Sequence, residues 1–320
     1  MKRKIKPILT FATVIMFFNL TIIPVTLFSQ TKQTDEKRAV YIHDYMFSLK
    51  KIEAITEIRD LLDKYTPIGI NNLVCFFDLS SKPKDYDFLK LLIREAHKRG
   101  MKVHPIIHPG YPVKLEGEIK QHPEWLIMGR KGEIYPNLNL ANKGARDYIL
   151  RIISDVLNNY NVDGIRLDYI RFQLHNGFSY DKTTCEVFKK EFGKSPLEVK
   201  DDCGSIIWCE WIKWNAKHVT TLVREIKELI KGSGKDIPLS VDVFPDLVAA
   251  KVEIAQDWGA WAEEGIVDVI CPMIYTNNLD IFRNCVKEAV KIANGKCKVY
   301  SGIGIRSSHN TNIPKELCRK

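Results

Sequence analysis

Short apolar segments alternate with longer amphipathic segments along most of the chain. The short segments are rich in β-branched and aromatic residues, and they predict strands at 39–45, 72–77, 102–108, 164–170, 238–244, 267–275 and 299–305. Apolar residues recur every three or four positions in between, which predicts helices at 49–64, 87–99, 145–159, 211–231 and 280–294. This alternation indicates an α/β protein with a parallel sheet. Seven strands in series favour a (β/α)8 barrel of the TIM type over a doubly wound sheet.

The predicted barrel is one unit short. After position 305 only 306–320 remain, too few residues for a helix, a closing strand and a final helix. We therefore expect 38–320 to form a (β/α)8-type barrel that lacks its last strand and helix at the C-terminus. Two predicted connections, 109–144 and 171–205, are long. Both follow strands, on the side of such a barrel that carries chemistry.

Residues 1–30 have the pattern of an export signal. Four cationic residues within the first six positions precede an apolar run at 8–28, after which polar residues return. The run is long enough to cross a membrane, so an uncleaved N-terminal anchor is the alternative. The same four cations supply much of the net charge of +9, and the charge therefore does not indicate nucleic-acid binding. We expect an exported monomer, in the periplasm, at the cell surface or secreted, with membrane contact only if the signal is uncleaved.

The cysteines and histidines bear on disulfides and metals. Eight cysteines permit disulfides in an exported chain, but their spacing selects no pairing. Cys75 and Cys271 lie inside predicted strands and are expected to be buried thiols. No cofactor is predicted, and the cysteine spacing disfavours a structural zinc site. His104 and His108 share one side of a predicted strand, which leaves a metal-dependent hydrolase as a third hypothesis for function.

The segment 161–172, NVDGIRLDYIRF, is the most informative for chemistry. Strand alternation places Arg166 and Asp168 on the side opposite Ile165, Leu167 and Tyr169. The apolar side suits packing against helices, so Arg166 and Asp168 are predicted to point into the barrel, with Asp168 nearest the mouth. Arg166 is expected to lower the pKa of Asp168 and keep it ionised. An ionised carboxylate there suits a nucleophile or a base, whereas a buried ion pair that only fills the barrel is the alternative.

Motifs along the chain resemble known glycosidases. The segment 163–168, DGIRLD, resembles the fourth-strand motif of the α-amylase clan, with the same order of arginine and aspartate. The longer segment 160–172, together with 122–125, 137–139, 255–258 and 267–275, resembles glycosyl-hydrolase-like family 10. The resemblance implies a (β/α)8-barrel glycosidase that acts on an oligosaccharide or polysaccharide, of the cell-wall or surface glycan class. It also implies that Asp168 is the nucleophile or base.

A two-carboxylate mechanism needs a partner for Asp168. Asp242, on the fifth predicted strand, is the provisional acid, because the α-amylase analogy places the acid at the end of that strand. Asp44, Asp78 and Asp246 remain alternatives. The predicted substrate contacts are Asp78, His108, Tyr111, Asn139, Arg166, Arg171 and Tyr275. Because an unclosed sheet would leave two edges unpaired, an inactive or carbohydrate-binding barrel is the alternative function.

Overall fold

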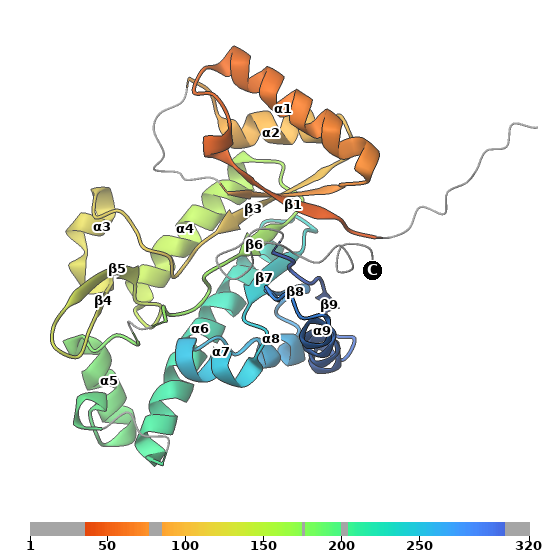
Figure 1. Cartoon of the computed structure of the whole chain (residues 1–320). Helices are drawn as coiled ribbons and strands as arrows, with labels where there is room; N and C mark the ends of the chain where they lie inside the picture. Colours follow the sequence, from red (N-terminus) through yellow and green to blue (C-terminus); the bar gives the residue numbers. More distant parts are fainter. Residues whose placement is uncertain (1–35, 77–84, 175–176, 200–203, 305–320) are drawn as a thin grey trace, which may run out of the picture. The chain divides into compact units, whose positions relative to one another are not determined.

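One parallel, curled sheet organises the molecule. The computed structural model describes residues 36–76, 85–174, 177–199 and 204–304, and its helices and strands all belong to the compact unit Lys37–Lys320. The strands run in the order β1-β2-β3-β6-β7-β8-β9, so that the sheet follows the order of the chain (Figure 1). Their bounds are Ala39–His43 for β1, Asn72–Phe76 for β2, Lys102–Ile107 for β3, Ile165–Leu167 for β6, Leu239–Val243 for β7, Val269–Pro272 for β8 and Lys298–Val299 for β9. The α/β class is therefore confirmed, and each of the seven predicted strands overlaps a strand of this sheet. The last overlap is short, because β9 covers only residue 299 of the predicted 299–305.

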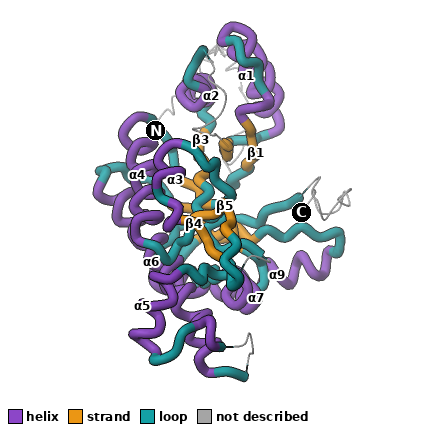
Figure 2. Tube along the Cα trace, turned by 90° about the vertical axis from the view of Figure 1, so that its left-hand side faces the viewer, coloured by secondary structure: helices purple, strands orange, loops and turns teal. Residues whose placement is uncertain are grey.

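Helices connect successive strands and cover the outside of the sheet. The connecting helices are α1 (Lys51–Tyr65), α2 (Phe88–His97), α4 (Lys143–Asn159), α6 (Ile206–Gly232), α7 (Leu247–Ile254), α8 (Trp258–Glu264) and α9 (Leu279–Ala293). Helices α4 and α6 lie side by side (Figure 2). Local signals fix where the helices begin: the side chain of Asn142 accepts a hydrogen bond from the backbone N–H of Ala145 and caps α4. The five predicted helices are all present, whereas α7 and α8 were not predicted.

The long connection after β3 contains its own small sheet. Helix α3 (Gly117–Gln121) precedes an antiparallel hairpin of β4 (Leu126–Met128) and β5 (Ile134–Leu138). No strand was predicted there, because β4 has only three residues and β5 contains Pro136, which cannot donate a hydrogen bond to a strand ladder. The connection after β6 likewise contains a helix, α5 (Lys182–Phe192).

One side of β6 is apolar and the other is polar, as predicted. Ile165 and Leu167 are fully buried in the main hydrophobic cluster, which also contains residues of α4 and α6. Arg166, between them, points to the interior of the curled sheet, where it pairs with an aspartate of β7. The predicted thiols Cys75 and Cys271 are also fully buried. The strand alternation therefore separates an apolar outer face from a polar interior.

Membrane contact was predicted only for the N-terminal segment. That segment, 1–30, lies outside the described residues. Within the described ranges, no helix has the length and the apolar composition needed to cross a bilayer. The predicted shortage of residues after 305 also concerns positions outside the described ranges.

Candidate active site

Asp168 lies immediately after β6, at the carboxyl end of the sheet. Its backbone N–H donates to the carbonyl of Ile107 on β3 at 3.0 Å, so its position is fixed by the neighbouring strand. Its side chain is only 14% exposed. One carboxylate oxygen, Oδ1, accepts the backbone N–H of Tyr169 at 2.7 Å, and the other, Oδ2, lies 3.9 Å from Nε2 of His108. Asp168 is therefore a buried carboxyl group held between a backbone donor and an imidazole.

A tight turn after Asp168 holds this geometry. Tyr169 has a φ of 53°, in the left-handed region that side chains other than glycine rarely adopt. Its carbonyl accepts the N–H of Gly110 at 2.8 Å, which joins the turn to the loop after β3. A Cβ at Gly110 would lie 2.0 Å from the carbonyl oxygen of Arg171, so only glycine fits there. Backbone strain of this kind persists where surrounding contacts enforce it, and it clusters at functional sites.

An ion pair lies below Asp168, in the interior of the sheet. Nε of Arg166 donates to Oδ2 of Asp242 at 3.0 Å, and Nη2 donates to Oδ1 of the same carboxylate. Nη2 also donates to the hydroxyl of Tyr41 at 2.9 Å. Burial raises the pKa of Tyr41, and the charge of Asp242 adds to this effect. Arg166 is thus paired with Asp242, and the alternative of a buried ion pair between Arg166 and Asp168 is wrong.

This arrangement reverses the predicted ionisation of Asp168. Burial raises the pKa of Asp168 to about 7, and the negative charge of Asp242 raises it further. The N–H of Tyr169 and the cations Arg171 and Arg166 oppose the shift without cancelling it. The expectation that Arg166 keeps Asp168 ionised is therefore corrected, because a carboxylate on the next strand neutralises that cation.

The two predicted interior histidines have different surroundings. His108 lies beside Asp168, and burial lowers its pKa to about 4, with a smaller contribution from His43. Nε2 of His104 lies 2.9 Å from Oδ1 of Asn72, and burial lowers the pKa of His104 to about 4 as well. Within the described ranges no three histidine, cysteine or acidic side chains are grouped so that they could hold a metal ion. The metal-dependent alternative thus gains no support from this pair.

Several predicted substrate contacts do surround Asp168. The ring of Tyr111 lies 5.6 Å from that of His108, and Tyr111 is 49% exposed. Burial raises the pKa of Tyr275 to about 12, with further contributions from the charges of Asp242 and Asp168. Tyr275 is therefore a neutral phenol within electrostatic range of both carboxyl groups.

Arg171 is held by aromatic rings at the same mouth. Its guanidinium carbon lies 4.3 Å from the ring centre of Tyr169 and 4.9 Å from that of Phe244. Nη1 donates to the carbonyl of Phe172 at 3.2 Å, whereas Nε is buried and has no hydrogen-bond partner among the described residues. Burial lowers the pKa of Arg171, and the nearby Tyr169 and Asp168 oppose this shift. The predicted contact Arg171 therefore belongs to the Asp168 site.

Other predicted residues lie elsewhere. Asn139 is fully buried, and its amide donates to Asp181 at 3.0 Å and to Thr184 at 3.1 Å. The prediction that Asn139 contacts substrate is wrong, because the inserted helix α5 and its capping residue occupy the amide. Asp246 is exposed and caps α7 by accepting the N–H of Ala249. Asp78 lies outside the described residues.

Asp44 and Asp242 complete the candidate partner carboxylates. Asp44 begins a short 3-10 helix, Asp44–Met46, directly after β1. Asp242 is 2% exposed, and both of its oxygens accept charge-assisted hydrogen bonds from the guanidinium of Arg166. The geometry therefore disfavours the predicted role of Asp242 as the acid.

The sequence missed Tyr169 and Gly110. Strand alternation placed Tyr169 on the side opposite Asp168, but the left-handed turn ends the alternation and brings its ring within 4.8 Å of the Tyr111 ring. Gly110 carried a weak signal, as a glycine two residues after His108 at a strand end.

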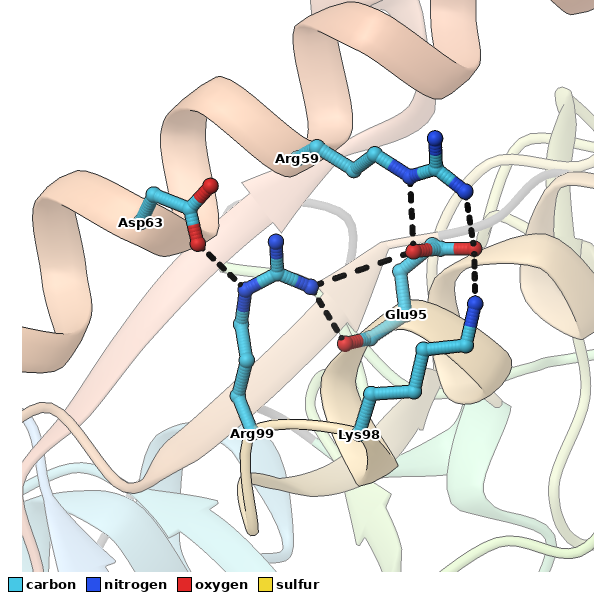
Figure 3. Close-up of a pocket in the computed structure, with 5 residues that line it drawn as sticks. All are labelled: Arg59, Asp63, Glu95, Lys98 and Arg99. Atoms are coloured by element: carbon cyan, nitrogen blue, oxygen red, sulfur yellow. Dashed lines mark hydrogen bonds and ion pairs between the residues drawn. The ribbon is translucent and has the colours of Figure 1, made fainter.

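A separate depression between α1 and α2 is lined by charges. Its volume is about 490 Å³, and its lining residues are Arg59, Asp63, Glu95, Lys98 and Arg99 (Figure 3). Nε of Arg59 donates to Oε2 of Glu95 at 2.9 Å, and Nζ of Lys98 donates to Oε1 at 3.1 Å. Nε of Arg99 donates to Oδ1 of Asp63 at 2.7 Å. These charges satisfy one another and support the packing of α1 on α2.

Comparison with known proteins gives the family. The family model "Glycosyl hydrolase-like 10" matches residues 77–316 of this chain. The chain belongs to this family. Relatives include glycosyl hydrolase YngK of Bacillus subtilis, 22% identical over 69% of this chain and 45% of its own length. Glycosyl hydrolase DigH of Escherichia coli K12 is 25% identical over 59% of this chain and 46% of its own length. The chain thus spans about half the length of these relatives.

Solved structures agree with the fold. The glycoside hydrolase domain of PgaB (BpsB) from Bordetella bronchiseptica has a TM-score of 0.70, 14% identity and coverage of 88% of both chains. A β-galactosidase from Marinomonas ef1 has a TM-score of 0.55 and 13% identity, over 75% of this chain and 41% of that chain. At these identities the likeness shows the fold, and it confirms the class of TIM-type barrels.

Proposed function

We propose that this protein is a glycoside hydrolase that cleaves glycosidic bonds within an oligosaccharide or polysaccharide. The observation that carries the proposal is Asp168, a buried carboxyl group with a pKa of about 7 at the carboxyl end of a parallel sheet. Tyr111, Tyr275 and His108 surround it with rings and hydrogen-bonding groups. Pockets that bind sugars combine apolar surface with a few polar groups of this kind. Family membership is consistent with this chemistry.

Asp168 is proposed to transfer the proton. A catalytic acid or base works best when its pKa is close to the working pH, because both protonation states are then populated. With a pKa of about 7, the protonated Asp168 donates its proton to the glycosidic oxygen as the bond between that oxygen and the anomeric carbon breaks. When a water molecule then adds to the anomeric carbon, the ionised Asp168 takes a proton from that water and is restored. A nucleophile would need to be ionised throughout, so the proton-transfer role replaces the nucleophile of the two roles predicted from the sequence.

The neighbours of Asp168 are proposed to bind the sugar and to set its pKa. Neutral His108 and the phenol of Tyr275 offer hydrogen bonds to sugar hydroxyls, and the exposed ring of Tyr111 offers apolar contact. Arg171 adds a buried cation, held against the rings of Tyr169 and Phe244. Asp242 acts through its charge and its hold on Arg166, which makes it a positioning residue.

The proposal also covers the cellular location, the substrates and the oligomeric state of the enzyme. The pattern of residues 1–30 supports export, to the periplasm, the cell surface or the medium. Glycans accessible to an exported enzyme are those of the cell wall or the cell surface, and these are the proposed substrates. We propose that the protein acts as a monomer. Fractionation of cells that produce the full chain checks the export, and light scattering checks the monomer.

Substitution of Asp168 tests the function directly. Purified wild-type protein is incubated with cell-wall glycan and with surface polysaccharides, and new reducing ends are measured. Asp168→Asn keeps the shape but removes the proton, so we expect the rate to fall by about 10²- to 10⁴-fold. Asp147→Asn, on the outside of α4 in an exposed pair with Lys143, is the matched control and should retain the wild-type rate.

The same assay distinguishes the proposed enzyme from the alternative, an inactive barrel that only binds carbohydrate. An inactive barrel that only binds carbohydrate would show binding of glycan by both the wild-type protein and Asp168→Asn, with no reducing ends from either. Equal rates of cleavage by the wild-type protein and Asp168→Asn would also contradict the proposal, because another group would then carry the proton.

A further inference from the structure

A stack of four aromatic rings leads away from Asp168 along the carboxyl edge of the sheet. The ring of His108 lies 5.1 Å from that of Phe76, with planes 17° apart. Phe76 in turn lies 4.0 Å from His43, nearly parallel at 4°. His43 lies 4.8 Å from Tyr45, with planes 31° apart. The stack thus connects the Asp168 site to Tyr45 without a break.

The stack follows the order of the strands. His108 comes directly after β3, Phe76 ends β2, and His43 ends β1, and these three strands are neighbours in the sheet. Asp168 comes after β6, the next strand beyond β3. The rings therefore lie along the edge of the sheet on one side of Asp168, at the end of the barrel that carries chemistry.

Tyr45 is the outer end of this stack and is held in place. It is 76% exposed, so the ring face that does not meet His43 is open to solvent. The 3-10 helix that carries it is fixed on both sides. The N–H of His43 donates to Sδ of Met46 at 3.3 Å, and the buried Phe47 packs against Phe88 with ring centres 5.5 Å apart. Tyr45 thus presents a positioned aromatic face at the rim.

Aromatic groups also lie on the other side of Asp168. Phe244 directly follows β7 and Tyr275 lies beyond β8, the two strands after β6 in the sheet. Asp168 consequently has rings on both sides along the strand order. A site that binds only the end of a glycan needs apolar surface on one side, whereas a site that binds an internal bond needs it on both.

We propose that the open face of Tyr45 binds a sugar unit distant from the bond that is cleaved, so that the substrate is a glycan chain bound along the stack and cut internally. This inference rests on the proposed glycosidase function and names its substrate class. The pyranose face carries apolar C–H groups, which pack on an aromatic ring with little loss of conformational freedom. A single exposed ring on a protein surface is ordinary, but Tyr45 continues an ordered stack that ends beside the catalytic carboxyl group.

The test measures binding, which makes it independent of cleavage. All variants carry Asp168→Asn, and the probes are chitohexaose and chitobiose, measured by isothermal titration calorimetry. We expect the parent to bind chitohexaose more tightly than chitobiose. Tyr45→Ala should weaken the binding of chitohexaose by about tenfold, roughly the loss of one aromatic contact. The binding of chitobiose should not change, because a short glycan held near residue 168 does not reach Tyr45.

Two further variants test whether the loss of binding is specific to the aromatic ring of Tyr45. Tyr45→Phe keeps the ring and should bind chitohexaose like the parent. Ile206→Ala removes an equally exposed apolar side chain, 78% exposed at the start of α6, and should also bind like the parent. Equal loss for both glycans in Tyr45→Ala, unchanged binding in that variant, or no binding of chitohexaose by the parent would overturn the inference. The proposed glycosidase function is tested separately, by the cleavage assay with wild-type protein, so that failure of one proposal can be told from failure of the other.

Discussion

Glu95 in α2 and Asp168 after β6 are both buried carboxyl groups, and their surroundings shift their pKa values in opposite directions. Glu95 is 1% exposed and accepts hydrogen bonds from Arg59, Lys98 and Arg94, which lower its pKa to about 2. The side chain of Asp168 is 14% exposed and accepts one backbone N–H, and the pKa of Asp168 rises to about 7. Burial is therefore common to both groups, and the presence of paired cations decides the direction.

The difference separates a stabilising region from a reactive one. The cations around Glu95 come from α1, from the preceding residue Arg94 and from Lys98 directly after α2, so the cluster closes on itself. The cation nearest Asp168 along the chain, Arg166, is instead taken by Asp242 from the next strand. Near neutral pH both protonation states of Asp168 are therefore populated, whereas Glu95 is ionised, and an exchangeable proton is what an acid–base catalyst needs.

Among the variants considered, Asp242→Asn is expected to change the stability of the protein most, and to remove the difference between Asp168 and Glu95. Asp242→Asn leaves Arg166 buried without its counter-charge, which is expected to lower the free energy of unfolding by about 3–5 kcal/mol. The variant also removes a charge that raises the pKa of Asp168 and leaves Arg166 available to lower it, so Asp168 should come to resemble Glu95. Urea denaturation measures the first effect. Asp147→Asn is the control, since its ion pair is exposed and should contribute less than about 1 kcal/mol.

The same change of acid to amide should alter stability in opposite directions at the two sites. The pKa of Glu95 lies below its unfolded value, so its ionised form stabilises the fold above about pH 4. Glu95→Gln should therefore lower the free energy of unfolding by about 1–3 kcal/mol at pH 8, and this loss should disappear as the pH falls toward 2.

Ionisation of Asp168 has the opposite effect on the free energy of unfolding. Its folded pKa lies above its unfolded value, so ionisation of Asp168 destabilises the fold as the pH rises from about 4 to about 7. Asp168→Asn should therefore raise the free energy of unfolding by about 1–3 kcal/mol at pH 8 and have little effect at pH 4. Denaturation curves at both pH values measure this. A loss of stability at pH 8 in both variants would remove the distinction between the two sites.

The sequence predicted the sheet well, because each strand and helix has its own periodicity. It also placed Arg166 and Asp168 on the polar side of β6, since Ile165 and Leu167 are apolar. It did not predict the partner of Arg166, because that depends on the register between strands. Arg166 lies opposite Ser240 on β7, and the guanidinium reaches Asp242 two residues further on.

Other features of the site could not be predicted from the periodicity of apolar residues, because they depend on backbone conformation and on contacts between distant segments. The left-handed Tyr169 ends the alternation and adds a ring to the mouth. Asn139 was expected at the site, but Asp181 of the inserted segment binds its amide. The ring stack from Tyr45 to His108 joins residues from three strands, and only their parallel pairing brings these rings together.

Titration of the Asp168 carboxyl carbon by ¹³C NMR tests the central claim most directly. Aspartate labelled at the carboxyl carbon is incorporated into wild-type protein, and comparison with Asp168→Asn assigns the resonance. The account predicts that Asp168 titrates with a pKa of about 7. A pKa of about 4 or below, the ordinary range for aspartate, would show that Asp168 is ionised at neutral pH and would contradict its role as the proton donor.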